Sequence, residues 1–470
     1  MIGMWAAFRR REWHALARIE TAVARGWVHV RLWSHRRTAL VILGWALLLR
    51  LAFAALTANT YDPDEFVILT LSRGMAHGAV PYRSFLFFHP PGVLVLFGQL
   101  QSLVNLWWPS GRIMLMLIDS ITAVMVWRIG RILYSDRVAF AAGMLYGASP
   151  IPLLAAVHIG QDSLITALGV AGLLCLLLRR SLPGAILAGA LLGLAIWIKY
   201  PALVFLPVYV MAAPRRSPAV LLGAAATLVG LLVPLAHEFR NLYAESVTWQ
   251  MVQRVHAAPP LRLAAVISFW LVLNPLAAYA ILRRRRAPLW LLVGFAMGGV
   301  FIFAAEAYYH YFAPIAPFAA LLAAPLLVTA FRRRPRTTLL VGAAVLGLWA
   351  AAANIGPAQA GLGLLPLSGV QPAIRVLDNQ TARGQRVLAD EFEYAYLAHR
   401  PPASDYFWNL STVTSARSLE HVLPGAAAVV TTTGNALPYP PGFMDYLKRH
   451  RYSEVRAGEA TIWILPRRKG

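Results

Sequence analysis

The chain has 470 residues, of which 59% are apolar and only 13% charged, and its mean hydropathy is +0.58. Ordinary soluble domains contain about 25% charged residues, so this composition argues against a soluble enzyme. The 43 basic and 20 acidic residues give a formal net charge of +23. In a mostly apolar chain, this excess favours arginines that flank membrane spans over nucleic-acid binding. The single cysteine, Cys175, excludes an intrachain disulfide.

Residues 1–37 combine eight arginines with four tryptophans and lack the pattern of a cleavable signal. This mixture predicts an interfacial amphipathic segment, and a solvated cytoplasmic tail is the alternative.

A polytopic all-α membrane domain is predicted for residues 38–353. A span needs about 20 apolar residues, and about eleven runs qualify or nearly qualify. The two short runs, 182–198 and 201–213, are predicted to form a hairpin. The predicted spans are 38–58, 112–133, 138–157, 162–178, 182–198, 201–213, 218–236, 263–282, 287–305, 311–330 and 337–353.

Charge predicts the orientation of these spans. If they alternate, 23 arginines fall on one side and seven basic residues in the loops of the other. Because basic residues in short loops stay cytoplasmic, the amino terminus is expected inside and the region after residue 353 outside. The preference for arginine over lysine suggests a high-GC bacterium, so the predicted location is the bacterial cytoplasmic (inner) membrane.

The last part of the chain, 354–470, is predicted to be a small extracytoplasmic α/β domain. Its composition changes from about residue 371. Runs typical of strands occur at 386–390, 426–433 and 460–466, and helical patterns occur at 392–400 and 443–451.

The first outer loop, 59–111, carries the most conspicuous polar cluster: Asp62, Asp64 and Glu65 lie within four residues. One of the aspartates is expected to cap the helical pattern that follows. A cap needs only one short polar side chain, and three carboxylates at a membrane surface repel one another. We therefore interpret this cluster as catalytic.

Further candidates are expected on the same outer side. Asp162 opens a span and either caps it or joins the site. Lys199 is the only lysine of the membrane part. Snorkelling is the alternative role, but arginine would snorkel equally well, so the compact ammonium is expected to bind a phosphate. His89 and Arg83 are the other candidate phosphate ligands. Aromatic residues that either bind substrate or form an interfacial belt are Tyr61, Tyr82, Tyr309, His310 and Tyr311. Within the spans, Arg50 and Asp119 share a depth and are predicted to pair, or Arg50 faces an anionic ligand.

Five motifs in register resemble the GT-C glycosyltransferases, particularly the protein O-mannosyltransferases and the lipid A aminoarabinose transferases. The matching residues, spread over about 38–330, are Asp64-Glu65, Pro90-Pro91, Asp162, Lys199-Tyr200-Pro201, and Tyr309-His310-Tyr311 with Pro314 and Pro317. The resemblance implies transfer of a sugar from a polyprenyl phosphate to an acceptor on the outer face.

The resemblance also implies roles for single residues. Asp64 would act on the acceptor with Asp162 beside it, although Asp62 is an equally placed base. A basic residue before the Pro-Pro contacts the donor phosphate in such enzymes. Aminoarabinose transferases often have lysine there and this chain has His89, which shifts weight to Lys199.

Chemistry alone leads to the same residues. A phosphate leaves without protonation if cations stabilise its charge, and a carboxylate must take the proton of the acceptor hydroxyl. One base and a direct displacement give inversion. The spacing requires no cofactor and no metal ligand set, although a divalent ion between the acids and the phosphate is compatible with it. A transporter or flippase of a lipid-linked substrate is the main alternative, and a non-catalytic scaffold is the other. The sugar and the acceptor (lipid, glycan or protein) stay open.

Overall fold

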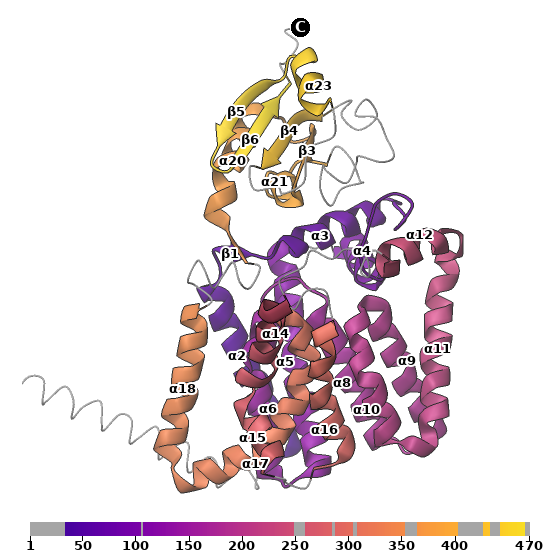
Figure 1. Ribbon diagram of the computed structural model, residues 1–470, viewed down its shortest axis with the longest axis vertical. Helices are drawn as coiled ribbons and strands as arrows, with labels where there is room; N and C mark the ends of the chain where they lie inside the picture. Colours follow the sequence, from indigo (N-terminus) through magenta and orange to yellow (C-terminus); the bar gives the residue numbers. More distant parts are fainter. Residues whose placement is uncertain are drawn as a thin grey trace, which may run out of the picture.

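The computed structural model describes residues 33–104, 107–248, 259–283, 287–303, 308–352, 364–402, 426–432 and 442–465. Nearly all of the predicted amphipathic segment 1–37 lies outside these residues. A long helical bundle forms one part of the molecule, and a small domain with a sheet rises from one end of it (Figure 1). Two helices, α3 (Pro63–Ala76) and α4 (Gly92–Val104), lie across that end of the bundle.

The bundle consists of helices that are often interrupted by short 3-10 or π segments. Its helices are α2 (His35–Leu56), α5 (Trp108–Leu133), α6 (Asp136–Gly147), α7 (Pro150–Ala156), α8 (Asp162–Leu178), α9 (Leu182–Ile198), α10 (Phe205–Ala212), α11 (Ser217–Leu232), α12 (Phe239–Tyr243), α14 (Pro259–Ile267), α15 (Pro275–Leu282), α16 (Leu289–Ala296), α17 (Ala316–Arg333) and α18 (Pro335–Ala352). The interrupting segments are η2 (Tyr200–Val204), η3 (Pro214–Arg216), η4 (Val233–Glu238), η5 (Ala244–Thr248), η6 (Ser268–Val272), η7 (Met297–Phe303) and η8 (Tyr309–Ile315).

These helices are suited to a membrane. Within the described residues, four helical stretches are long and apolar enough to cross a bilayer, or six if two bent pairs each count as one span. Five further apolar helices have 10–17 residues. The protein is therefore a membrane protein with a mostly helical bundle, as predicted, while the number of eleven spans stays a prediction.

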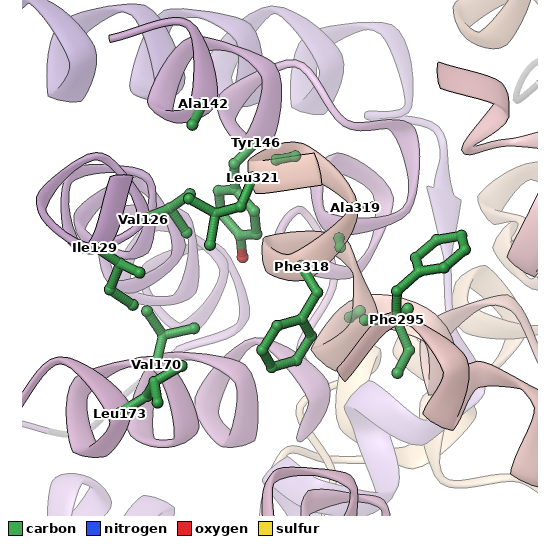
Figure 2. Close-up of a cluster of buried hydrophobic side chains, with 14 of the residues drawn as sticks. Val126, Ile129, Ala142, Tyr146, Val170, Leu173, Phe295, Phe318, Ala319 and Leu321 are labelled. Carbon is green, nitrogen blue, oxygen red and sulfur yellow. The ribbon is translucent and has the colours of Figure 1, made fainter. Parts of the chain in front are cut away.

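The centre of the bundle is packed from side chains of five helices. Figure 2 shows Val126 of α5, Tyr146 of α6, Val170 of α8, Phe295 of α16 and Phe318 of α17 facing one another in one buried cluster. Close helix contact also depends on glycine: a Cβ at Gly189 of α9 would lie 2.0 Å from the carbonyl oxygen of Val220 in α11. Helices α9 and α11 therefore approach backbone to backbone.

The predicted pair inside the spans is formed. The Nε atom of Arg50 in α2 donates a hydrogen bond of 2.8 Å to Asp119 in α5, and both side chains are buried. The hydroxyl of Tyr146 in α6 donates to the other carboxylate oxygen of Asp119 at 2.5 Å. The alternative, in which Arg50 faces an anionic ligand, is not what the structure shows.

The C-terminal domain has a four-stranded sheet in the order β3-β4-β6-β5, in which β3 and β4 are parallel and the other pairs antiparallel. Its elements are β3 (Arg386–Ala389), β4 (Ala426–Thr432), β5 (Ser453–Ala457), β6 (Ala460–Ile464), α20 (Leu367–Gln380), α21 (Phe392–Leu397) and α23 (Phe443–Arg449). The small α/β domain is confirmed, with strands and helices at the five predicted places. Strand β5 and helix α20 were not predicted.

The C-terminal domain is joined to the segment 59–111, between α2 and α5, at two places. Strand β1 (Thr60–Tyr61) pairs antiparallel with β2 (Leu365–Pro366). Helix α21 packs on α3, where the rings of Phe66 and Tyr396 are 5.4 Å apart and Arg73 lies 4.9 Å from the Tyr396 ring centre. These contacts hold the start of α3 between the bundle and the domain.

Candidate active site

A cavity opens at the end of the bundle that α3 covers. The space between its walls measures about 490 Å³, open solvent included. Its walls come from the start of α3, the loop before α4, the turn before α8, the end of α9 and the start of η8. Seven residues that the sequence predicted for the site line it: Asp62, Asp64, His89, Asp162, Lys199, Tyr309 and His310.

The two aspartates at the start of α3 have different roles. Asp62 is the N-cap, and its carboxylate accepts a hydrogen bond of 3.0 Å from the backbone N–H of Asp64. Pro63 occupies the first helical position, which needs no N–H donor. The Asp64 carboxylate lines the cavity and accepts no hydrogen bond from any residue that the structure describes. The sequence left the two aspartates equivalent, and the structure distinguishes them.

Glu65 turns away from the cavity into a polar cluster. Its carboxylate binds the Arg112 guanidinium at 2.6 and 2.8 Å and the Trp108 indole N–H at 2.8 Å. It also accepts the backbone N–H groups of Asp62 and Ile159, each at 3.0 Å. We call this cluster the Glu65 latch. It fixes the N-terminus of α3 to α5 and to the turn before α8, so Glu65 is placed to position the site and not to touch a substrate.

Lys199 and Asp162 form the second ion pair of the site. The Lys199 ammonium, at the end of α9, donates a hydrogen bond of 2.8 Å to Oδ2 of Asp162, at the start of α8. Both residues are buried. The same ammonium lies 5.0 Å from the ring centre of Tyr311, within range of a cation–π contact. A Cβ at Gly92 would lie 2.7 Å from the carbonyl oxygen of Trp197, so α4 begins directly against the end of α9 that carries Lys199.

Burial and like charge shape the ionisation of the first-loop acids. Burial, then the neighbouring Asp64 and Glu65, raise the pKa of Asp62 well above its usual range. Burial also raises the pKa of Asp64; Asp162 and Glu65 act in the same direction, and the Lys199 ammonium opposes them. Burial alone would raise the pKa of Glu65, but the Arg112 guanidinium holds it below its ordinary value. Glu65 is therefore the carboxylate that stays ionised most firmly.

The histidines of the cavity are neutral. Burial, followed by the nearby Lys199, lowers the pKa of His89 to about 3. Burial lowers the pKa of His158 to about 4. His89 can then offer a phosphate a hydrogen bond but no positive charge, which leaves Lys199 as the cation of the cavity among the described residues that line it.

Besides Glu65, four predicted site residues lie outside the cavity walls. Tyr61 donates a hydrogen bond of 3.0 Å to Glu393 of the C-terminal domain. Tyr82 donates one of 2.7 Å to the backbone oxygen of His89 and so supports that loop. The Arg83 guanidinium, whose side chain is 64% exposed, lies 4.0 Å from Glu238. Tyr311 is the fourth; its ring contacts Lys199 and lies 4.9 Å from the ring of His310.

Other residues of the site were not predicted from the sequence. His158 and Gln161 line the cavity from the turn before α8, and no motif marks them. Arg112 was counted only as an outer basic residue, although a charged residue at the start of an apolar run was a usable signal. Glu391 approaches the site from the C-terminal domain: burial, then Glu393, Asp390 and Asp64, raise its pKa to about 9.

Comparisons with known proteins agree with this geometry. Residues 88–237 match the family model of dolichyl-phosphate-mannose-protein mannosyltransferase. The structure is similar to that of ArnT from Cupriavidus metallidurans bound to undecaprenyl phosphate, with a TM-score of 0.64 and 15% identity over 91% of this chain and 98% of that chain. Its apo structure matches with a TM-score of 0.63 and 14% identity over 94% of this chain and 98% of that chain. The chain has the GT-C fold.

A more distant GT-C structure is also similar. It is the archaeal oligosaccharyltransferase AglB from Archaeoglobus fulgidus, in complex with an inhibitory peptide and a dolichol-phosphate. The TM-score is 0.50, with 13% identity over 93% of this chain and 75% of that chain. No curated protein sequence matches the chain. The resemblance to GT-C glycosyltransferases inferred from the five motifs is thus confirmed, and it extends over the whole fold.

Proposed function

We propose that this protein is an integral-membrane inverting glycosyltransferase that moves a sugar from a polyprenyl-phosphate donor to an acceptor hydroxyl on the outer face of the membrane. The observation that carries the proposal is the shared cavity at one end of a GT-C bundle. There the Asp64 carboxylate, without a hydrogen-bond partner among the described residues, lies with the Lys199–Asp162 pair.

Asp64 is the proposed base. A hydroxyl is a weak nucleophile, and a positioned carboxylate that takes its proton during attack contributes roughly 10²- to 10⁴-fold to the rate. The burial that raises the pKa of Asp64 makes it a stronger base than an exposed aspartate. Asp62 is the weaker candidate because its carboxylate caps α3.

Lys199 is the proposed contact of the donor phosphate. An ammonium has three N–H donors, and Asp162 takes one of them at 2.8 Å. The remaining donors are available to the phosphate oxygens, whose charge grows as the bond to the sugar breaks. Neutral His89 would add a hydrogen bond. A single displacement of phosphate by the acceptor oxygen inverts the anomeric carbon, since no protein carboxylate forms an intermediate.

The comparisons support the class of donor. The ArnT structure holds undecaprenyl phosphate and the AglB structure a dolichol-phosphate, both polyprenyl phosphates. A long apolar lipid also explains why the site lies at the end of a membrane bundle. The proposal does not specify the sugar: mannose, glucose and arabinose-type pentoses fit equally. The acceptor is a lipid, a glycan or a protein. No cofactor is needed for this chemistry, and within the described residues no group of three or more His, Cys, Asp or Glu is arranged to hold a metal ion.

The test compares Asp64→Asn with Asp136→Asn, a matched change at an acid whose side chain is 52% exposed and that pairs with Arg131. Each variant is expressed in cells that lack the wild-type gene, and envelope glycans and lipids are measured by mass spectrometry. We expect Asp64→Asn to reproduce the loss of a glycoconjugate seen without the protein, and Asp136→Asn to restore it. Normal glycoconjugates with Asp64→Asn at equal expression would refute the role of Asp64.

Purified protein in detergent separates the proposal from the transporter alternative. Micelles have no second compartment, so transport has no product there, whereas sugar transfer from a polyprenyl-phosphate donor continues. Release of polyprenyl phosphate that depends on an acceptor supports the transferase. Its absence with every donor and acceptor extract that the cell supplies would favour the transporter.

A further inference from the structure

Three buried hydrogen-bond acceptors line the floor of the cavity. They are Nε2 of His158, Oε1 of Gln161 and Oδ1 of Asp162, and none has a hydrogen-bond partner among the residues that the structure describes. Their residues are only 2%, 4% and 4% exposed. We call these three residues the acceptor floor.

Contacts on the other side of the group fix two of these atoms as acceptors. Nδ1 of His158 lies 3.1 Å from the backbone oxygen of Leu154, which can only accept, so Nδ1 carries the proton and Nε2 offers a lone pair. Oδ2 of Asp162 binds Lys199, which fixes the carboxylate and leaves Oδ1 without a partner among the described residues. Gln161 directly precedes α8, and its backbone oxygen accepts the N–H of Ile165 at 3.0 Å.

This arrangement is unfavourable unless something donates hydrogen bonds to it. A buried polar atom left without a partner costs about 1–3 kcal/mol, and the large majority of such atoms in proteins are paired. Here three of them lie within five residues of the chain, on residues that line one cavity. Because all three are acceptors, their complement is a ligand with several donor groups close together.

We infer that the acceptor floor binds hydroxyl groups of the sugar that is transferred. This inference rests on the proposed function and adds a specificity to it. Lys199 neutralises Asp162, and His158 and Gln161 are uncharged, so the floor is suited to uncharged donor groups such as hydroxyls. It therefore favours a sugar with several free hydroxyls over one in which these hydroxyls are missing or blocked. The floor lies beside the Lys199–Asp162 pair, where a sugar attached to a phosphate on Lys199 would lie.

The test measures binding of polyprenyl-phosphate sugars and of polyprenyl phosphate without a sugar, using the purified full chain in detergent and calorimetry. Donors with mannose, glucose and an arabinose-type pentose are compared first, and the tightest is used thereafter. The variants are His158→Leu and Gln161→Leu. Ser163→Ala is the matched control, since the Ser163 hydroxyl is buried without a partner in the same segment and does not line the cavity.

We expect the wild type to bind the sugar-bearing lipid more tightly than the bare lipid. Each leucine variant should reduce this ratio by about tenfold, the equivalent of one hydrogen bond, with unchanged affinity for the bare lipid. The control should change neither affinity. A donor whose sugar lacks the contacted hydroxyl should show the same loss with the wild type and no further loss with the variant.

Three results would overturn the inference. The first is an unchanged ratio of the two lipid affinities in both leucine variants, which means that water and not the sugar donates hydrogen bonds to the floor. The second is an equal loss of affinity for both lipids, which marks a structural role. The third is unchanged affinity of the wild type for a donor whose sugar lacks these hydroxyls. If the wild type binds neither lipid, the proposed function fails together with the inference. If it binds both lipids but the leucine substitutions leave the ratio of the two affinities unchanged, only the inference fails.

Discussion

Replacement of Glu65 by Gln is the sharpest test of how the site is built. The Glu65 carboxylate accepts five hydrogen bonds, from Arg112 (two), Trp108, Ile159 and Asp62. Glutamine has the same shape, but its amino group cannot accept a hydrogen bond, and it removes the charge opposite Arg112. That residue is only 8% exposed, so its guanidinium would be left buried without its anionic partner.

The structure gives the size of the effect. Removing one partner of a buried ion pair destabilises a protein by about 3–5 kcal/mol. The matched control is Glu238→Gln, because Glu238 lies 4.0 Å from an exposed Arg83 and such surface pairs contribute only about 0–1 kcal/mol. The free energy of unfolding is measured by titration with sodium dodecyl sulfate in mixed micelles. A free energy of unfolding of Glu65→Gln within about 1 kcal/mol of that of the control would refute our interpretation of the latch.

Activity should fall together with stability. The latch fixes the N-cap residue Asp62 and the N–H of Ile159, the residue that follows His158 in the chain. A displacement of about 1 Å between reacting groups can cost 10²-fold in rate. We therefore expect the residual folded Glu65→Gln protein to lose kcat with little change in the affinity for polyprenyl phosphate, since Lys199 is not part of the latch. A loss of affinity with unchanged kcat would instead place Glu65 in the donor site.

Further predictions concern charge. Arg50→Leu or Asp119→Leu should each destabilise the bundle by about 3–5 kcal/mol in the same titration, whereas the double leucine variant should recover most of the loss; equal effects of single and double variants would contradict the pairing. Burial raises the pKa of Glu391 from 4.5 to about 9, so the fold favours the neutral acid and stability falls as pH rises between these values. Glu391→Gln should remove this fall. The measurement is the free energy of unfolding at pH 5 and at pH 9. Because Lys199 lowers the pKa of Asp64, Lys199→Gln should move the acidic limb of log kcat/KM to higher pH, and a shift to lower pH would exclude Asp64 as the base.

Much of the fold was predictable because a bilayer imposes length, apolar composition and charge asymmetry on the chain. The same physics explains what was missed. Strand β5 (Ser453–Ala457) is largely exposed and lies at the edge of the sheet, so it has no apolar run to reveal it. Helix α20 contains Pro372, a residue that argues against a helix, and it was therefore missed although its buried residues lie along one face.

The site was predicted as a set of chain positions and not as a set of contacts. Asp64, Asp162 and Lys199 come from three separate segments, and the motifs predicted that they belong together. The motifs contain no information on orientation, so Tyr61 was grouped with the site although its hydroxyl points to the C-terminal domain. The partner of Glu65 is 47 residues away along the chain, a contact that no local pattern encodes.

The contacts explain how a membrane protein keeps four carboxylates at one end of a bundle. Glu65 is neutralised by Arg112, Asp162 is neutralised by Lys199, and Asp62 is stabilised by the N-terminus of α3. Asp64 alone among these four has no direct partner in the described structure. A base must have a free lone pair and an elevated proton affinity, and Asp64 has both. Glu65 and Asp162 are each bound to a cation and Asp62 caps α3, so Asp64 is the carboxylate of the four that is best placed to take up a proton.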